Sequence, residues 1–106
     1  MVKKILTAAG FVEGKTFKET RFLKPPKSTY CIYMDSVERR GADDVNLIKE
    51  HMLSIELYSY VADSEAEKRI ETEFDARGIP YTKQPRYWLD TEQLYQVVYD
   101  FNYFEK

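Results

Sequence analysis

DSEAEKRIETEFDARGIPYTKQPRYWLDTEQLYQVVYDFNYFEK, residues 63–106, is the stretch that decides the fold. Its first part repeats apolar side chains every four residues, which predicts an amphipathic helix over residues 64–77. Its last part, residues 94–104, places large apolar side chains at every second position, the period of a strand with one buried face. The helix can cover that face, so the stretch predicts an α+β domain with helices packed on an antiparallel sheet.

The expected helix has its own start and stop signals. Ser64 and Glu67 have the spacing of a capping box, and Asp63 is the alternative N-cap. Gly78 stands where a left-handed residue would end the helix. The buried stripe is expected to consist of Ala66, Ile70 and Phe74.

The outer face of this helix is acidic. Glu65 with Arg69, and Glu73 with Arg77, have the spacing of i,i+4 ion pairs. Each such pair stabilises a helix by only about 0.3–0.5 kcal/mol. The acidic run is therefore expected to be a solvated helix face.

The other elements are predicted from shorter patterns. Residues 2–9 carry apolar side chains on one helical face, and residues 11–27 indicate a loop with one short edge strand. Residues 29–35 are apolar on both strand faces, which predicts a central strand covered on both sides. Residues 35–44 indicate a polar hairpin loop, and residues 45–61 a long strand. The result is a mainly antiparallel sheet of four to five strands with two helices on one face.

Length and composition favour one folded domain, residues 1–106. Hydrophobic residues make up 43% of the chain and aromatic residues 15%, which disfavours disorder. The formal net charge of −2 argues against a generic polyanion binder. The charge is uneven, since residues 1–27 contain seven Lys and Arg against two Glu. This polarity suits head-to-tail packing of copies, and a solvated basic N-terminal segment is the simpler alternative.

No residue pattern indicates a catalytic site. His51 is the sole histidine and shares strand parity with Leu53 and Ile55, which predicts a histidine on the sheet face. Cys31, the one cysteine, lies in an apolar strand, where burial would raise the pKa of its thiol. An unpaired buried cysteine also fits a reducing compartment. We therefore expect no enzyme activity.

Metal, cofactor and membrane signals are weak as well. The carboxylates around the expected hairpin loop lack the spacing of a calcium loop, and the four glycines stand apart rather than form a phosphate cradle. These carboxylates are Asp35, Glu38, Asp43 and Asp44. The N-terminal apolar stretch stops at Ala9, and no apolar run of about 18 residues follows. We expect no metal, no cofactor, no signal peptide and no membrane span.

Two groups of residues are candidate interaction sites. Arg39 and Arg40 on the expected loop could contact an acidic partner or a phosphate, or form a solvated tip. The second group follows Ile79, Pro80 and Tyr81, which predict the start of a further strand, and it consists of Lys83, Arg86, Tyr87 and Trp88. Aromatic rings with cations beside them can stack on nucleic-acid bases or anchor a protein interface. Because no larger group of basic residues surrounds these four, we favour the protein interface. The alternative is that Trp88 packs on the sheet.

Four stretches of the chain carry a family resemblance. They are PPKSTYCIY at residues 25–33, IELY at 55–58, the helix and turn from Glu67 through GIPYTK at 78–83, and EQLYQVVYDF at 92–101. Together they resemble small prophage proteins of Gram-positive bacteria that complete the tail or join it to the head. The resemblance spans about residues 25–104 and consists of short motifs of ordinary strand residues.

The resemblance implies a structural protein of the virion with no catalytic residues. Its partners would be other phage head, neck and tail proteins, together with further copies of the chain in a ring around the tail axis. It would reside in the host cytoplasm during assembly and then in the virion, with no membrane and no specific nucleic acid as partner. The alternative from a different class is a small adaptor module that binds protein or nucleic acid.

Overall fold

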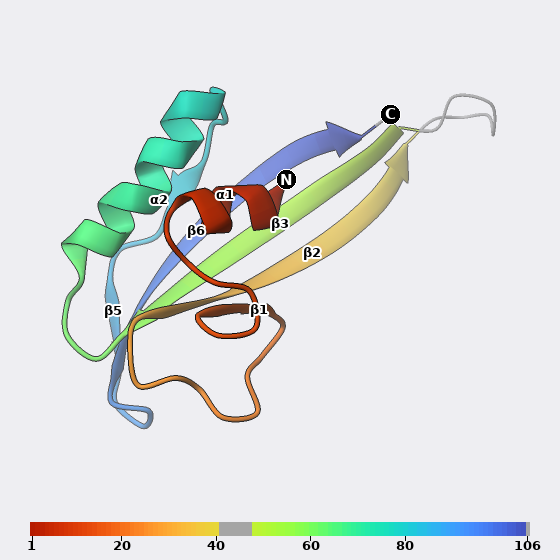
Figure 1. Cartoon of the computed structure of the whole chain (residues 1–106). Helices are drawn as coiled ribbons and strands as arrows, with labels where there is room; N and C mark the ends of the chain where they lie inside the picture. Colours follow the sequence, from red (N-terminus) through yellow and green to blue (C-terminus); the bar gives the residue numbers. More distant parts are fainter. Residues whose placement is uncertain (41–47, 106) are drawn as a thin grey trace.

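The computed structural model describes residues 1–40 and 48–105, and these form an α+β fold of two helices and six strands (Figure 1). The elements in chain order are α1 (Val2–Ala8), β1 (Phe17–Glu19), β2 (Tyr30–Arg40), β3 (Ile48–Ser59), α2 (Ser64–Arg77), β4 (Thr82–Lys83), β5 (Tyr87–Leu89) and β6 (Leu94–Glu105). The fold class predicted from the sequence is confirmed.

The sheet is built on three long antiparallel strands. Its strand order is β1-β2-β3-β6-β4, and β5 also pairs with β6. The strands β2, β3 and β6 are 11, 12 and 12 residues long and pair along almost their whole length. The short strands complete the edges, with β1 parallel to β2 and with β4 and β5 antiparallel to β6. The sheet therefore exceeds the expected four to five strands because its edges are made of short pieces.

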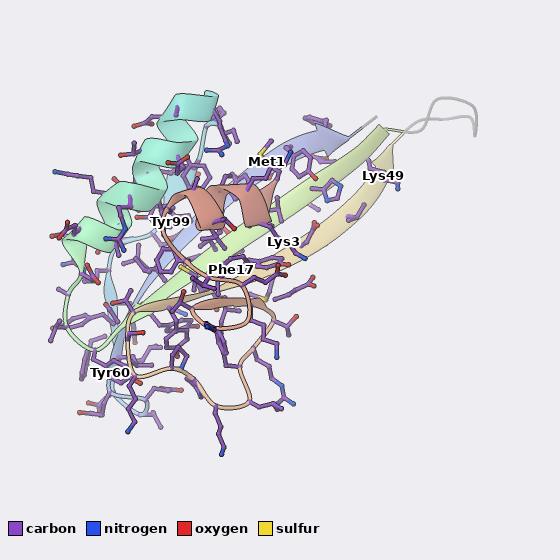
Figure 2. The ribbon with its side chains drawn as sticks, in the orientation of Figure 1. Met1, Lys3, Phe17, Lys49, Tyr60 and Tyr99 are labelled. Carbon is purple, nitrogen blue, oxygen red and sulfur yellow. The ribbon has the colours of Figure 1, made fainter. Side chains whose placement is uncertain are left out.

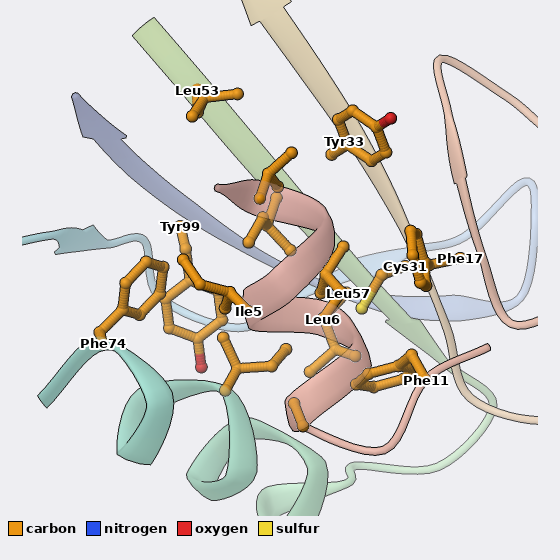
Figure 3. Packing of buried hydrophobic residues seen from close by; sticks show 14 of the residues in the cluster. Ile5, Leu6, Phe11, Phe17, Cys31, Tyr33, Leu53, Leu57, Phe74 and Tyr99 are labelled. Carbon is orange, nitrogen blue, oxygen red and sulfur yellow. The ribbon is translucent and has the colours of Figure 1, made fainter. Parts of the chain in front are cut away.

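Both described helices cover the same face of the sheet (Figure 1). Ile5 and Leu6 of α1 and Phe74 of α2 are fully buried against strand residues such as Tyr99 (Figure 3). The Phe74 ring packs edge-on against Phe101, with ring centres 4.9 Å apart. The large apolar side chains that alternate in residues 94–104 therefore lie on the helix-covered face of β6.

The ends of α2 differ in part from the expectation. The side chain of Asp63 accepts a hydrogen bond from the Ala66 amide at 3.0 Å, so Asp63 is the N-cap and the Ser64 capping box is wrong. The hydroxyl of Thr29 also donates to Asp63, at 2.7 Å, which ties the start of β2 to the start of the helix. Gly78 ends the helix in the left-handed conformation, with φ of 64°, as predicted.

The second face of β2 is less covered than the sequence indicated. Tyr30 is buried there by stacking on Tyr58 and by an edge contact with Phe22. Met34, farther along the strand, is 41% exposed because the helices lie on the opposite face. The expectation that residues 29–35 are covered on both sides is therefore wrong beyond the first residues.

The three long strands continue past the helices as an extended ribbon (Figure 1). We call its outer half the distal ribbon, made of residues 34–40, 48–53 and 101–105. Residues 35–40 pair with β3 in this ribbon, so they belong to a strand and not to the predicted hairpin loop. The rest of that expected loop, residues 41–47, lies outside the described residues. Strand pairing holds residues 35–40 extended although no apolar alternation marks them.

Candidate interaction surface

Two acidic residues of α2 hold the segment that forms the sheet edge. The Glu67 carboxylate lies 2.9 Å from Nζ of Lys83 and 2.7 Å from Nη2 of Arg86. The Glu71 carboxylate lies 2.8 Å from the same lysine nitrogen. Because Glu67 is only 5% exposed, the expectation of a solvated acidic helix face is wrong at this position.

The network continues into the core through Tyr99. Its hydroxyl donates to Glu71 at 2.6 Å, and the Lys83 ammonium lies 5.9 Å from the centre of its ring. Burial and the bond to Glu71 raise the pKa of Tyr99 above its usual range. Burial alone would raise the pKa of Glu71, but the hydrogen bonds from Lys83 and Tyr99 outweigh it and lower that pKa. Glu71 is thus held ionised between the edge segment and the core.

The structure separates the four edge residues singled out in the sequence. Lys83 and Arg86 turn toward α2, where each is paired with a carboxylate. Trp88 lies opposite Tyr95 on the helix-covered face, whereas Tyr87 lies opposite Gln96 on the other face. The two cations and two aromatic rings therefore do not form one patch, and their role in an interface stays a prediction.

The aromatic residues of this edge remain accessible. Tyr87 is 56% exposed and Trp88 39% exposed. The indole of Trp88 packs edge-on against Tyr95, with ring centres 4.8 Å apart, and its nitrogen donates to Asp90 at 3.3 Å. Trp88 is therefore packed on the sheet on one side, as the simpler interpretation expected, and open to a partner on the other.

Further exposed apolar residues lie at this end of the sheet. Tyr60 and Val61 follow directly after β3, and the Tyr60 hydroxyl donates to the carbonyl of Pro26 at 3.1 Å. Leu23 is exposed in the same loop as Pro26. Figure 2 shows Tyr60 at the opposite end of the sheet from Lys49. Sequence reasoning missed these residues because each stands alone in a polar segment, without a periodic pattern.

The sheet face without helices, here called the uncovered face, is apolar and acidic. Its accessible apolar side chains include Met34, Met52, Val98 and Phe104, and its carboxylates are those of Glu50, Glu56 and Asp100. Among the strand residues whose side chains are described, Lys18 of β1, opposite Ile32, is the one basic residue on this face. Met34 and Phe104 are exposed on it, and exposed apolar residues gathered on one face are a feature of interaction sites in soluble proteins.

Arg39 and Arg40 are placed at the outer end of β2. They pair with Lys49 and Ile48 of β3, so they belong to the distal ribbon. Their side chains lie outside the described part of the structure, and their contact with a partner stays a prediction.

His51 lies on the helix-covered face, as its strand parity predicted. Its Nδ1 lies 2.9 Å from a carboxylate oxygen of Asp35, and its ring stacks on Tyr103 with centres 4.5 Å apart. Sequence reasoning missed Asp35 as the partner, although Asp35 has the parity that places it on the same face.

Cys31 is fully buried, and burial raises the pKa of its thiol as expected.

The described residues contain no group of three or more His, Cys, Asp or Glu placed to hold a metal ion. Within the same residues, no helix has the length and hydrophobicity needed to cross a membrane.

A scan of the chain against models of known protein families finds no match, and a search of curated proteins finds no significant match either.

Proposed function

We propose that this chain is a structural component of a phage particle that completes the tail or joins it to the head. It acts through contacts with other head, neck and tail proteins. The observation that carries the proposal is the ribbon of β2, β3 and β6, which extends past the helices with one face uncovered. The resemblance of residues 25–104 to small prophage joining proteins is the reason for proposing that this surface contacts phage proteins.

Two features of the surface support an assembly role. Exposed Tyr and Trp side chains, as at Tyr60, Tyr87 and Trp88, supply interface area at a low entropy cost. They lie at the end of the sheet opposite the distal ribbon, so the chain offers apolar surface at both ends. Copies that met through two different surfaces would form a ring where the rotation between them closes, which is the symmetry that a position on the tail axis requires.

The test is deletion of the gene in an inducible lysogen, followed by electron microscopy of the lysate. Separate filled heads and free tails in place of joined particles are the expected result. Wild-type protein supplied from a plasmid should restore joined particles. Normal infectious particles from the deletion strain would contradict the proposal.

A small adaptor module that binds nucleic acid is the second candidate. The observation that favours it is a group of exposed cations before, along and after β1. These cations are Lys15, Lys18, Arg21, Lys24 and Lys27. Binding through them would weaken steeply with salt, because each neutralised phosphate releases a counterion. Fluorescence anisotropy with labelled duplex DNA at several salt concentrations tests this, with charge reversal at Arg21 and Lys24 as the variant.

A further inference from the structure

The outer edge of β6 is only partly paired. Strand β3 pairs with β6 from Tyr95 to Glu105, whereas β4 pairs with it only at Tyr99 and Asp100. Beyond Asp100, none of the described strands lies on the second side of β6. Residues 101–105 therefore form a strand with one open edge.

The direction of the open backbone groups follows from one hydrogen bond. The Gln84 amide donates to the carbonyl of Val98 at 2.8 Å, so the backbone groups of Val98 point toward the β4 side. Backbone groups alternate in direction along a strand, which places those of Asn102 and Phe104 on the same side. Their N–H and C=O groups consequently point away from β3 and are available to a further strand.

A cleft begins where β4 leaves β6. It encloses about 380 Å³ and is lined by Pro80, Tyr81, Thr82, Asp100, Phe101 and Asn102. Pro80 has no N–H and cannot continue the ladder, so the chain before Thr82 does not cover the open edge. An added strand would enter this cleft at one end and lie along residues 102–104.

The open edge lacks most of the usual protection. Natural edge strands are blocked by lysines, prolines or inward-pointing charges. Residues 101–104 read Phe-Asn-Tyr-Phe and contain neither a charge nor a proline, so Glu105 is the one charged residue of the open edge. Phe104 is 59% exposed on the uncovered face, and Asp100, the one carboxylate that lines the cleft, lies on that face too.

We propose that the β6 edge at residues 102–104 binds an extended segment of another protein, which adds a strand beside β6. Backbone hydrogen bonds to Asn102 and Phe104 supply affinity, as in other strand-addition complexes. An apolar side chain of the segment packs on Phe104, and a Lys or Arg faces Asp100. The inference does not depend on the virion role, since an adaptor could use the same edge.

The first experiment uses a synthetic peptide as the probe. The peptide alternates valine with threonine and carries a lysine at each end, and a control peptide carries glutamates in place of the lysines. Titration of the ¹⁵N-labelled protein should shift the amide signals of Asn102 and Phe104 with the lysine peptide and far less with the glutamate peptide. Equal binding of both peptides, or shifts confined to other residues, would overturn the proposal.

The second experiment changes the open edge itself. Phe104→Pro removes the outward N–H while leaving the bonds to β3, and Phe104→Thr keeps the N–H but removes the ring. We expect Phe104→Pro to weaken peptide binding about tenfold or more, from the lost bond together with the lost ring, and Phe104→Thr to weaken it less. Unchanged affinity in Phe104→Pro would overturn the proposal.

A third measurement does not depend on whether the proline variant folds. A probe peptide N-methylated at alternate residues cannot form the ladder along one edge, so it should bind wild-type protein more weakly than the parent peptide. Equal affinity would contradict strand addition.

Sedimentation of wild-type and Phe104→Thr protein without peptide should give the same mass. A wild-type oligomer that the variant converts to a monomer would mean that a second copy occupies the edge, and would overturn its assignment to another protein.

Discussion

Arg86 donates two hydrogen bonds to one oxygen of Glu67, from Nε at 3.0 Å and from Nη2 at 2.7 Å. The partners are 19 residues apart, and the carboxylate is nearly inaccessible to water. The pair fixes the segment between β4 and β5 to α2. The same carboxylate binds Lys83, so one helical residue positions much of the sheet edge.

Glu67→Gln should destabilise the protein by about 1–3 kcal/mol, because it leaves Lys83 and Arg86 without a shared negative partner. The free energy of unfolding in urea measures the effect. Glu65→Gln on the exposed side of α2 is the matched control and should change stability by less than about 0.5 kcal/mol. Equal effects of the two substitutions would contradict the structural role given to Glu67.

Phe74→Ala should destabilise by about 3–5 kcal/mol, because it leaves a cavity among large buried side chains. Its ring is fully buried and contacts Tyr81, Tyr99 and Phe101. Thermal or urea unfolding gives the value, with Val61→Ala at an exposed position as the control. A loss below about 1 kcal/mol would show that α2 packs in another register.

Asp63→Ala should cost about 1 kcal/mol at neutral pH through loss of the helix N-cap, whereas Ser64→Ala should cost much less. The hydrogen bond from Thr29, together with that from the Ala66 amide, lowers the pKa of Asp63. A lowered folded-state pKa gives stability that is present above the ordinary Asp pKa, near 4, and lost as the pH falls through the folded-state value. Urea unfolding at neutral and acidic pH should therefore show a smaller difference between wild type and Asp63→Ala in acid. A difference that grows in acid would contradict this.

Reversal of charge at Arg39 and Arg40 should leave folding intact but impair particle assembly. Both residues lie at the outer end of the ribbon, away from the core. Complementation of the deletion lysogen gives the particle yield, and circular dichroism reports the fold. Reversal at Lys4 and Lys68, both exposed on helices, is the matched control. Wild-type yield from the Arg39 and Arg40 variant would rule out their role.

Local patterns in the sequence predicted the helices and the long C-terminal strand. The stripe of Ile70 and Phe74 and the alternation in residues 94–104 are periodic because each element has one face in the core. Gly78 ended the helix because its left-handed backbone suits glycine. Such features depend on neighbours in the chain, so they can be read from it.

The errors concern contacts between distant residues. Glu67 has the spacing of a capping box with Ser64, but its partners come from the edge segment after the helix. Residues 35–40 look like a polar loop, yet pairing with β3 makes them a strand. The parallel pairing of β1 with β2 likewise joins segments on either side of a proline-containing loop. Spacing alone does not encode these pairings.

The position of β6 between β3 and the short strands β4 and β5 has a consequence for how the protein folds. This strand follows all the other described elements in the chain, yet β3, β4 and β5 all pair with it. The hairpin of β2 and β3 can form from nearby residues, whereas the pairing of β3 with β6 must close a loop that contains α2, β4 and β5. Closing such a loop costs chain entropy before the contacts form, which slows folding. The strands β4 and β5 therefore acquire their place only when β6 has paired with β3. An emerging chain that lacks β6 would leave Ile55 and Phe74 exposed to aggregation and proteolysis.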